Sequence, residues 1–215
     1  MNLKRTVLCV ALFLGYVAQG GAQTGTTNEE AEVEPIAWPQ EQRPKLGTTS
    51  FYANFDGIHV PMYRIQSDRL SFELANRKTL RVTPPSSSRY SGHLTDSRIP
   101  NVSLGISVFK KGEFLPDLSE ESWTAYKAGL LIDKPNIDVV LENTNIGQAK
   151  TPYIFGKQFR QIVYEQKTSR GIIKRRELFA FVGSNLLVFT INGTKESIDQ
   201  NWNAVEHLIG EMTLN

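Results

Sequence analysis

The most constraining feature of this sequence is a run of three strand-like segments, two of which are apolar on both faces. Residues 158–167, 172–182 and 186–191 are separated by glycine-bearing turns at 169–171 and 183–185. The second segment contains LFAFV and the third contains LLVF, neither of which alternates with polar residues. A strand of this kind has to be covered on each side. We therefore predict a meander whose last two strands lie at the centre of a covered sheet.

Two amphipathic helices are predicted to supply that cover. Residues 119–131 begin with Ser119 as an N-cap and two glutamates, and apolar residues then recur at helical spacing. The C-terminal helix carries the clearer stripe, and Ser197 is expected to form its capping box with Gln200. The stripe consists of Ile198, Trp202, Val205, Ile209 and Met212.

Elsewhere, apolar and polar residues alternate as they do in strands with one buried face. The alternation covers residues 70–75, 79–83, 102–108 and 137–141, and the proline-, serine- and glycine-rich stretch 84–93 predicts a loop. We expect an α+β fold in which an antiparallel sheet is flanked by helices on both faces, an α-β-α sandwich.

The N-terminus has the pattern of a secretory signal. Residues 1–22 combine Lys4 and Arg5 with an apolar stretch and a small-residue cleavage site after Ala22. The apolar stretch is too short to span a bilayer, so we expect cleavage and export to the periplasm or the outside, with a retained membrane anchor as the alternative. Residues 23–50 are polar and proline-bearing, which predicts a disordered linker before a single domain at 51–215. Trp38 is the exception that favours docking onto the domain.

Composition excludes several classes of protein. The only cysteine is Cys9, so disulfide-stapled folds and thiolate metal sites are excluded for the exported domain. The 24 basic residues exceed the 22 acidic ones by two, and that excess equals Lys4 and Arg5 of the signal. A neutral domain with interspersed charges predicts no nucleic-acid binding.

Catalytic motifs are absent from the sequence. The histidines are His59, His93 and His207, and no two of them have metal-ligand spacing, so we expect neither a metal site nor a cofactor. The loop places His93 close in sequence to Ser91 and Asp96, but no nucleophile-elbow motif accompanies them. A hydrolase that uses the loop around His93 is therefore the alternative to a non-catalytic protein.

The hairpin from 157 to 177 is the one strongly basic segment, with seven cationic residues against two acidic ones. Because charges occupy both alternating sides over 174–176, we expect this end of the hairpin to be unburied and to project past the helices. Its cations then either discourage edge-to-edge aggregation or bind an acidic protein or anionic surface. The candidate binding residues are Arg170, Lys174 and Arg176.

The order of elements from about residue 70 resembles the PsbP-like and DcrB-like extracytoplasmic proteins. The segments that carry the resemblance are the strand NVSLGISVF, the helix SEESWTAY, the stretch GKQFRQIVY, the strand LLVFTI and the helix WNAVEHLI. The resemblance implies an antiparallel sheet flanked by helices and a non-enzymatic role as a binding, assembly or accessory factor. It assigns no residue, and residues 51–65 lie outside the matching pattern.

Overall fold

The computed structural model describes residues 33–41, 43–85, 87–143, 153–154 and 157–214. The predicted signal at 1–22 and the first ten residues of the predicted linker lie outside the described residues. The described residues belong to one compact unit that begins at Val33.

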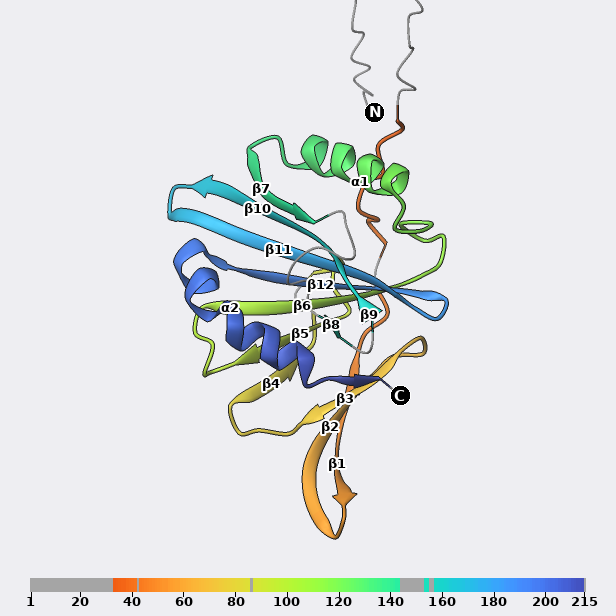
Figure 1. The fold of residues 1–215 in the computed structure, drawn as a ribbon, viewed down its shortest axis with the longest axis vertical. Coiled ribbons are helices and arrows are strands. Elements are labelled where there is room, and N and C mark those ends of the chain that lie inside the picture. The colour runs from red at the N-terminus through yellow and green to blue at the C-terminus, as the bar shows by residue number, and fades with distance from the viewer. Residues whose placement is uncertain (1–32, 42, 86, 144–152, 155–156, 215) are drawn as a thin grey trace, which may run out of the picture. The chain divides into compact units, whose positions relative to one another are not determined.

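Within these residues the chain forms strands and two helices (Figure 1). In chain order they are β1 (Gly47–Phe55), β2 (Ile58–Gln66), β3 (Ser71–Ala75), β4 (Leu80–Thr83), β5 (Gly92–Asp96), β6 (Val102–Lys110), α1 (Glu120–Asp133), β7 (Ile137–Asn143), β8 (Tyr153–Ile154), β9 (Lys157–Gln158), β10 (Arg160–Thr168), β11 (Gly171–Val182), β12 (Asn185–Thr194), α2 (Lys195–Gly210) and β13 (Thr213–Leu214).

The main sheet has seven antiparallel strands in the order β4-β5-β6-β12-β11-β10-β7. The predicted meander forms its centre, since β11 pairs with β10 on one side and with β12 on the other. A smaller antiparallel sheet has the order β1-β2-β3-β13, and β8 pairs with β9. The α+β architecture predicted from the alternation of apolar residues is confirmed.

Each face of the main sheet buries its own apolar cluster. On one face, alternate residues of β6, β11 and β12 pack with α2 and with the inner side of the small sheet. On the other face, the intervening residues pack with α1 and the segment that precedes it. The central strand β12 shows this directly, because Leu187 and Phe189 join the first cluster while Leu186 and Val188 join the second. Helices therefore cover both faces, as predicted.

The two helices begin at different kinds of cap. Ser119 caps α1 as predicted, because its side chain accepts a hydrogen bond from the Ser122 backbone N–H. The predicted cap of α2 at Ser197 is wrong: the helix begins three residues earlier, and Thr194 is the cap. Both Thr194 and Ser197 are residue types that cap helices, and the sequence alone does not decide between them. Neither helix among the described residues is long and apolar enough to cross a membrane.

The C-terminal part of the predicted linker packs against the domain. Trp38 is buried, and its ring lies 5.4 Å from that of Phe109 and 4.9 Å from that of Phe114. The Ile36 N–H donates to the Ala125 carbonyl of α1, and β1 already begins at Gly47. The described structure therefore differs from a linker extending to residue 50, and the docking expected of Trp38 is observed.

Gly129 permits this close approach between residues 33–46 and α1. A Cβ at this position would lie 2.2 Å from the Ile36 carbonyl oxygen. We predict that Gly129→Ala lowers the free energy of unfolding by about 1–2 kcal/mol, because the overpacking cost exceeds the gain in helix propensity. Urea denaturation measures the change. Gly210→Ala is the matched control, since nothing lies near its Cβ position and its stability should be unchanged or slightly raised. Equal effects of the two substitutions would contradict this packing.

Candidate functional site

His93 lies in a strand rather than in the predicted loop. It belongs to β5, where its backbone is in register with Thr83 of β4 and Gly105 of β6. Its ring is half-buried and 4.7 Å from the Tyr90 ring, and burial lowers the pKa of the imidazole. The prediction of a loop through residue 93 is therefore wrong at its C-terminal end. β5 was missed because it is short and two of its three buried positions are Gly92 and Asp96, which are not apolar side chains.

The hydroxyl and carboxylate near His93 are committed to structural bonds. Ser91 is fully buried, and its Oγ accepts a hydrogen bond from the Val108 backbone N–H at 3.2 Å. Asp96 lies three residues beyond His93, on the opposite face of the strand, and both of its oxygens bind the Arg98 guanidinium. This hydrogen bonding lowers the pKa of Asp96 to about 2. The structure does not arrange these three residues as a catalytic triad.

The three candidate binding residues of the basic hairpin lie in three different environments. Arg170 is exposed at the turn between β10 and β11. Lys174 is only 8% exposed, and it forms ion pairs with Asp199 of α2 and, at 3.8 Å, with Glu165 of β10. The Arg176 guanidinium is half-buried and stacks over the Trp202 ring at 3.5 Å. The expectation that charges at 174–176 cannot be buried is wrong, because α2 brings a carboxylate and an aromatic ring to meet them.

An ion cluster pairs Lys174 of this hairpin with carboxylates of β10 and α2. Besides its pair with Lys174, Glu165 binds Lys195 at 2.8 Å, and Lys195 also binds Asp199 at 3.1 Å. Two cations thus share two carboxylates. Within the described part of the chain, Lys167 and Arg170 are exposed cations of this hairpin without an ion pair.

A buried carboxylate beneath α1 was not predicted from the sequence. Glu177 has no exposed surface and accepts hydrogen bonds from Arg89 at 2.8 Å, from Tyr164 at 3.0 Å and from Tyr126. The Arg89 guanidinium also lies 3.7 Å from the centroid of the Trp38 ring. Burial and the nearby carboxylate raise the pKa of both phenols, so they remain protonated donors. The donors come from three separate segments, so no local motif signals the network.

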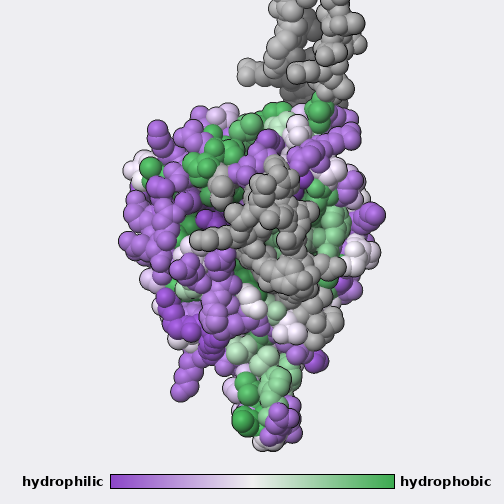
Figure 2. All heavy atoms as spheres, in the orientation of Figure 1, coloured by the Kyte–Doolittle hydropathy of each residue, from purple (hydrophilic) through white to green (hydrophobic). Residues whose placement is uncertain are grey.

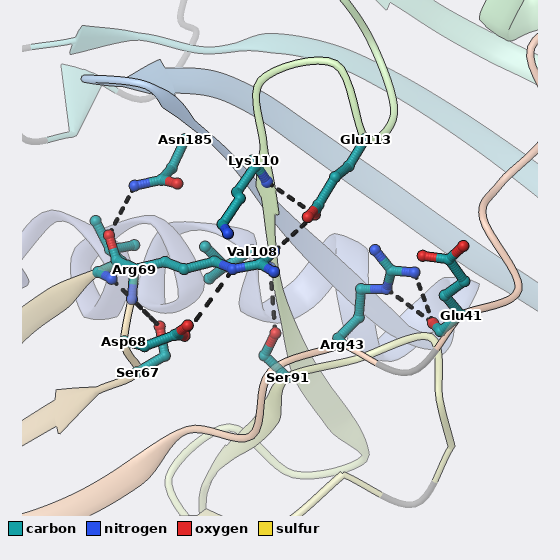
Figure 3. A network of polar contacts seen from close by, with 11 residues as sticks. Glu41, Arg43, Ser67, Asp68, Arg69, Ser91, Val108, Lys110, Glu113 and Asn185 are labelled. Atoms are coloured by element: carbon teal, nitrogen blue, oxygen red, sulfur yellow. Dashed lines mark hydrogen bonds and ion pairs between the residues drawn. The ribbon is translucent and has the colours of Figure 1, made fainter.

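A second polar network links the segment before β3 of the small sheet to the ends of β6 and β12 of the main sheet (Figure 3). Arg69 precedes β3 and donates to Glu113 at 2.6 Å, and Glu113 also accepts from the Lys110 backbone N–H at 2.9 Å. The Asn185 side chain donates to the Arg69 carbonyl at 2.7 Å, which adds the β11–β12 turn. An open hollow of about 370 Å³ lies beside these contacts, lined by Asp68, Arg69, Lys110, Lys111, Ser184 and Asn185. The Arg69–Glu113 ion pair and the two further hydrogen bonds hold these elements together.

Exposed apolar side chains gather on the β1–β2 hairpin, the region that the sequence pattern left unplaced. Tyr52, Phe55 and Ile58 are 72%, 55% and 67% exposed, and the hairpin shows as a largely apolar projection in Figure 2. β3 pairs with β2 only from Met62 onward, so the rest of the hairpin extends beyond the third strand (Figure 1). Asp56 and Gly57 form a tight turn with φ of 50° and 86°, closed by a 2.8 Å bond from the Gly57 N–H to Asn54 Oδ1.

No group of histidine, cysteine, aspartate or glutamate side chains within the described residues could hold a metal ion. A hollow of about 540 Å³ is open to solvent and lies over the ends of β4, β5, β6 and β12. It exposes hydroxyl, amide and arginine side chains but contains the Asp96 carboxylate only as the partner of Arg98. The lining of this hollow therefore offers mainly polar contacts.

Comparison with known proteins identifies the fold. No family model matches the sequence, and no curated protein matches it. Among solved structures, the cyanobacterial PsbP (CyanoP) of Synechocystis matches 76% of this chain and 97% of its own length, with a TM-score of 0.51 and 9% identity. LpqN of Mycobacterium tuberculosis, described as involved in cell envelope biogenesis, matches 78% and 91% respectively, with a TM-score of 0.46 and 11% identity. The likeness to CyanoP shows that the fold is PsbP-like.

The Asp96–Arg98 pair predicts a pH dependence of stability. The folded pKa of about 2 lies below the ordinary value of 3.8, so the pair stabilises the fold above about pH 4 and loses this effect as the pH falls toward 2. The difference corresponds to about 2 kcal/mol. We therefore expect Asp96→Asn to be less stable than the wild type by about this amount at pH 6, with the gap closing near pH 2. Urea denaturation at both pH values measures it.

Asp117→Asn is the matched control, because this exposed carboxyl also has a pKa of about 2 but binds only Ser119 and Ser122 at the start of α1. The free energy of unfolding of Asp96→Asn should still fall as the pH approaches 2, because Asp117 and its hydrogen bonds are unchanged in that variant. An Asp96→Asn protein as stable as the wild type at pH 6 would show that the pair does not hold β5 in place.

Proposed function

We propose that this chain is exported and acts as a non-catalytic binding or accessory protein whose β10–β11 turn contacts an acidic protein surface. The single observation that supports the contact is the exposure of Lys167 and Arg170 at the end of the hairpin, while Lys174 behind them is paired with Asp199 and Glu165. The turn therefore presents two positive charges that no described carboxylate occupies.

The turn is held in one shape, which favours recognition over a merely solvated strand end. Thr168 Oγ1 donates to the Gly171 carbonyl at 2.8 Å and accepts from the Arg170 N–H at 3.2 Å. Gly171 has a φ of 113°, which a side-chain-bearing residue rarely adopts. Because the backbone is fixed, little conformational entropy of the turn is lost when a partner binds.

The number of free cations favours a protein over a membrane as the partner. Electrostatic attachment to anionic lipid takes clusters of about four to eight basic residues. This turn offers two, and the next pair, Lys174 and Lys195, is bound by Glu165 and Asp199. Two cations suit a small contact in which a few carboxylates give orientation and a faster encounter.

Export and the absence of catalysis have separate support. The signal pattern of residues 1–22 supports export. The non-catalytic role is supported by the bonds of Ser91 and Asp96, since neither is free to act with His93 as a nucleophile or an orienting carboxylate. A binding role requires no further chemistry from these residues.

The experiment is crosslinking in the native compartment followed by mass spectrometry, with wild type compared to Lys167→Glu/Arg170→Glu. We expect an acidic protein to be captured by the wild type and bound roughly tenfold or more weakly by the double variant, because attraction becomes repulsion at two positions. Binding of the wild type should also weaken as the salt concentration rises.

Lys78→Glu/Arg81→Glu is the matched control, since it makes the same change of charge at exposed positions before and within β4. It should retain the partner. Capture that survives in the hairpin variant, or attachment only to anionic vesicles, would overturn the proposed contact. Accumulation of the unprocessed chain inside the cell would overturn export.

A further inference from the structure

Strand β1 is an open edge of the small sheet. It stands at the end of the order β1-β2-β3-β13, and within the described residues no strand pairs with its outer side. Seven of its nine residues are exposed. Its sequence, GTTSFYANF, contains neither a charged residue nor a proline. Natural proteins usually protect such an edge with charges, prolines, bulges or shortness, because its unpaired N–H and C=O groups recruit other strands.

The other edges of the described sheets carry the protection that β1 lacks. β13 has two residues and β4 has four, and β4 is followed directly by Pro84 and Pro85. β7 places the charged residues Asp138 and Glu142 on its strand. The contrast singles out β1 as an edge that is available for pairing.

We propose that β1 pairs with β1 of a second copy of this chain, antiparallel about a two-fold axis at Phe51. The two small sheets then form one continuous sheet across the axis. Full overlap of Gly47–Phe55 with its copy fixes this centre, because Phe51 is the middle residue of the strand. A two-fold interface requires one surface to complement itself.

The side chains of β1 are self-complementary in that register. Phe51 faces Phe51 of the second copy, and each remaining aromatic residue meets a small one: Tyr52 faces Ser50, and Phe55 faces Gly47. Cross-strand neighbours of this kind are the units that stabilise a sheet, and an aromatic residue beside an edge glycine shields its backbone. The pairing therefore covers Tyr52 and Phe55, two of the most exposed apolar side chains among the described residues.

The charges at the two ends of β1 are also complementary. Lys45 lies two residues before the strand and Asp56 directly after it, and both are exposed. Antiparallel pairing centred on Phe51 places Asp56 of one copy opposite Leu46 of the other, so that Lys45 lies one position from Asp56 at each end of the dimer. A hollow of about 200 Å³ lined by Thr48, Tyr63 and residues of β4 lies at the end of the strand where the tip of the second hairpin arrives.

A lipid bilayer is the competing occupant of this hairpin, and its tip argues against it. Asp56 lies in the turn at the tip of the β1–β2 hairpin, and the polar pair Asn54 and His59 lies just behind it. A charged turn that enters first is costly in hydrocarbon. The uncharged edge and the complementary ends of β1 favour a second copy of the chain.

Sedimentation equilibrium of the full chain in the Cys9→Ser background measures the oligomeric state, and single cysteines then report the register. We expect a dimer whose dissociation constant rises at least tenfold in Ser50→Lys, which places a cation on each side of the axis. Phe51→Cys should form an intermolecular disulfide on mild oxidation. Thr49→Cys is the matched control and should not, because the two residues at position 49 lie four residues apart in the register.

A charge exchange tests the ends of the strand. Lys45→Glu should weaken the dimer severalfold and Lys45→Glu/Asp56→Lys should restore it, with unchanged thermal unfolding showing that each variant is folded. A monomer at every concentration overturns the proposal, and so does a dimer that is indifferent to Ser50→Lys. Crosslinking at position 49 instead of 51 overturns the register. A monomer that binds neutral phosphatidylcholine vesicles through Phe55 assigns the hairpin to a membrane instead.

Discussion

The burial of β11 and β12 on both faces is the constraint on which the rest of the structure depends. Their alternate residues face two different apolar clusters, and neither cluster is complete without elements from distant parts of the chain. One face needs α2 and the inner side of the small sheet, and the other needs α1 and Trp38. At about 1.5–3 kcal/mol for each large apolar side chain, this burial is the main favourable contribution to folding. The positions of all functional candidates follow from it.

The polar groups beneath α1 are fixed by the same packing. Glu177 follows the charged end of β11 and lies where α1 closes over the sheet, so its buried oxygens need hydrogen-bond donors. Arg89 and two tyrosine hydroxyls supply them, and Trp38 covers the arginine. A buried carboxylate with fixed donors specifies how α1 and residues 33–46 dock. The exposed candidate residues therefore lie on the β10–β11 turn and the β1–β2 hairpin, away from the covered faces of the main sheet.

The patterns of apolar residues were sufficient to predict most of the main sheet, both helices and their arrangement on its two faces, but not the small sheet. They failed where the deciding contact comes from elsewhere in the chain. Lys174 and Arg176 look like exposed cations in sequence, but Asp199 and Trp202 of α2 meet them in the fold. Residues 33–46 look like a linker, but a glycine in α1 lets their backbone approach. β5 was missed because its short segment is defined by pairing with β4 and β6 rather than by its own pattern.

The candidate site was less predictable than the fold, for the same reason. Ser91, His93 and Asp96 are close in sequence, but they do not act together in the fold. Ser91 accepts a hydrogen bond from a backbone N–H, His93 lies on one face of β5, and Asp96 pairs with an arginine on the opposite face. The exposed β1 edge depends on which strands pair, and a sequence does not show which strand is left at the end of a sheet. The positions of these three residues and the exposed β1 edge can both be recognised only once the strand pairing is known.

Native-state hydrogen exchange tests the central claim most directly. The account predicts that the amides of β12 and the apolar half of β11 exchange only through global unfolding, with opening free energies equal to the unfolding free energy measured by denaturant. Protection should persist at Leu187, Val188 and Phe189 after the edge strand β7 has exchanged. Exchange of these three amides at an opening free energy well below that of global unfolding would contradict a sheet whose centre is sealed on both faces.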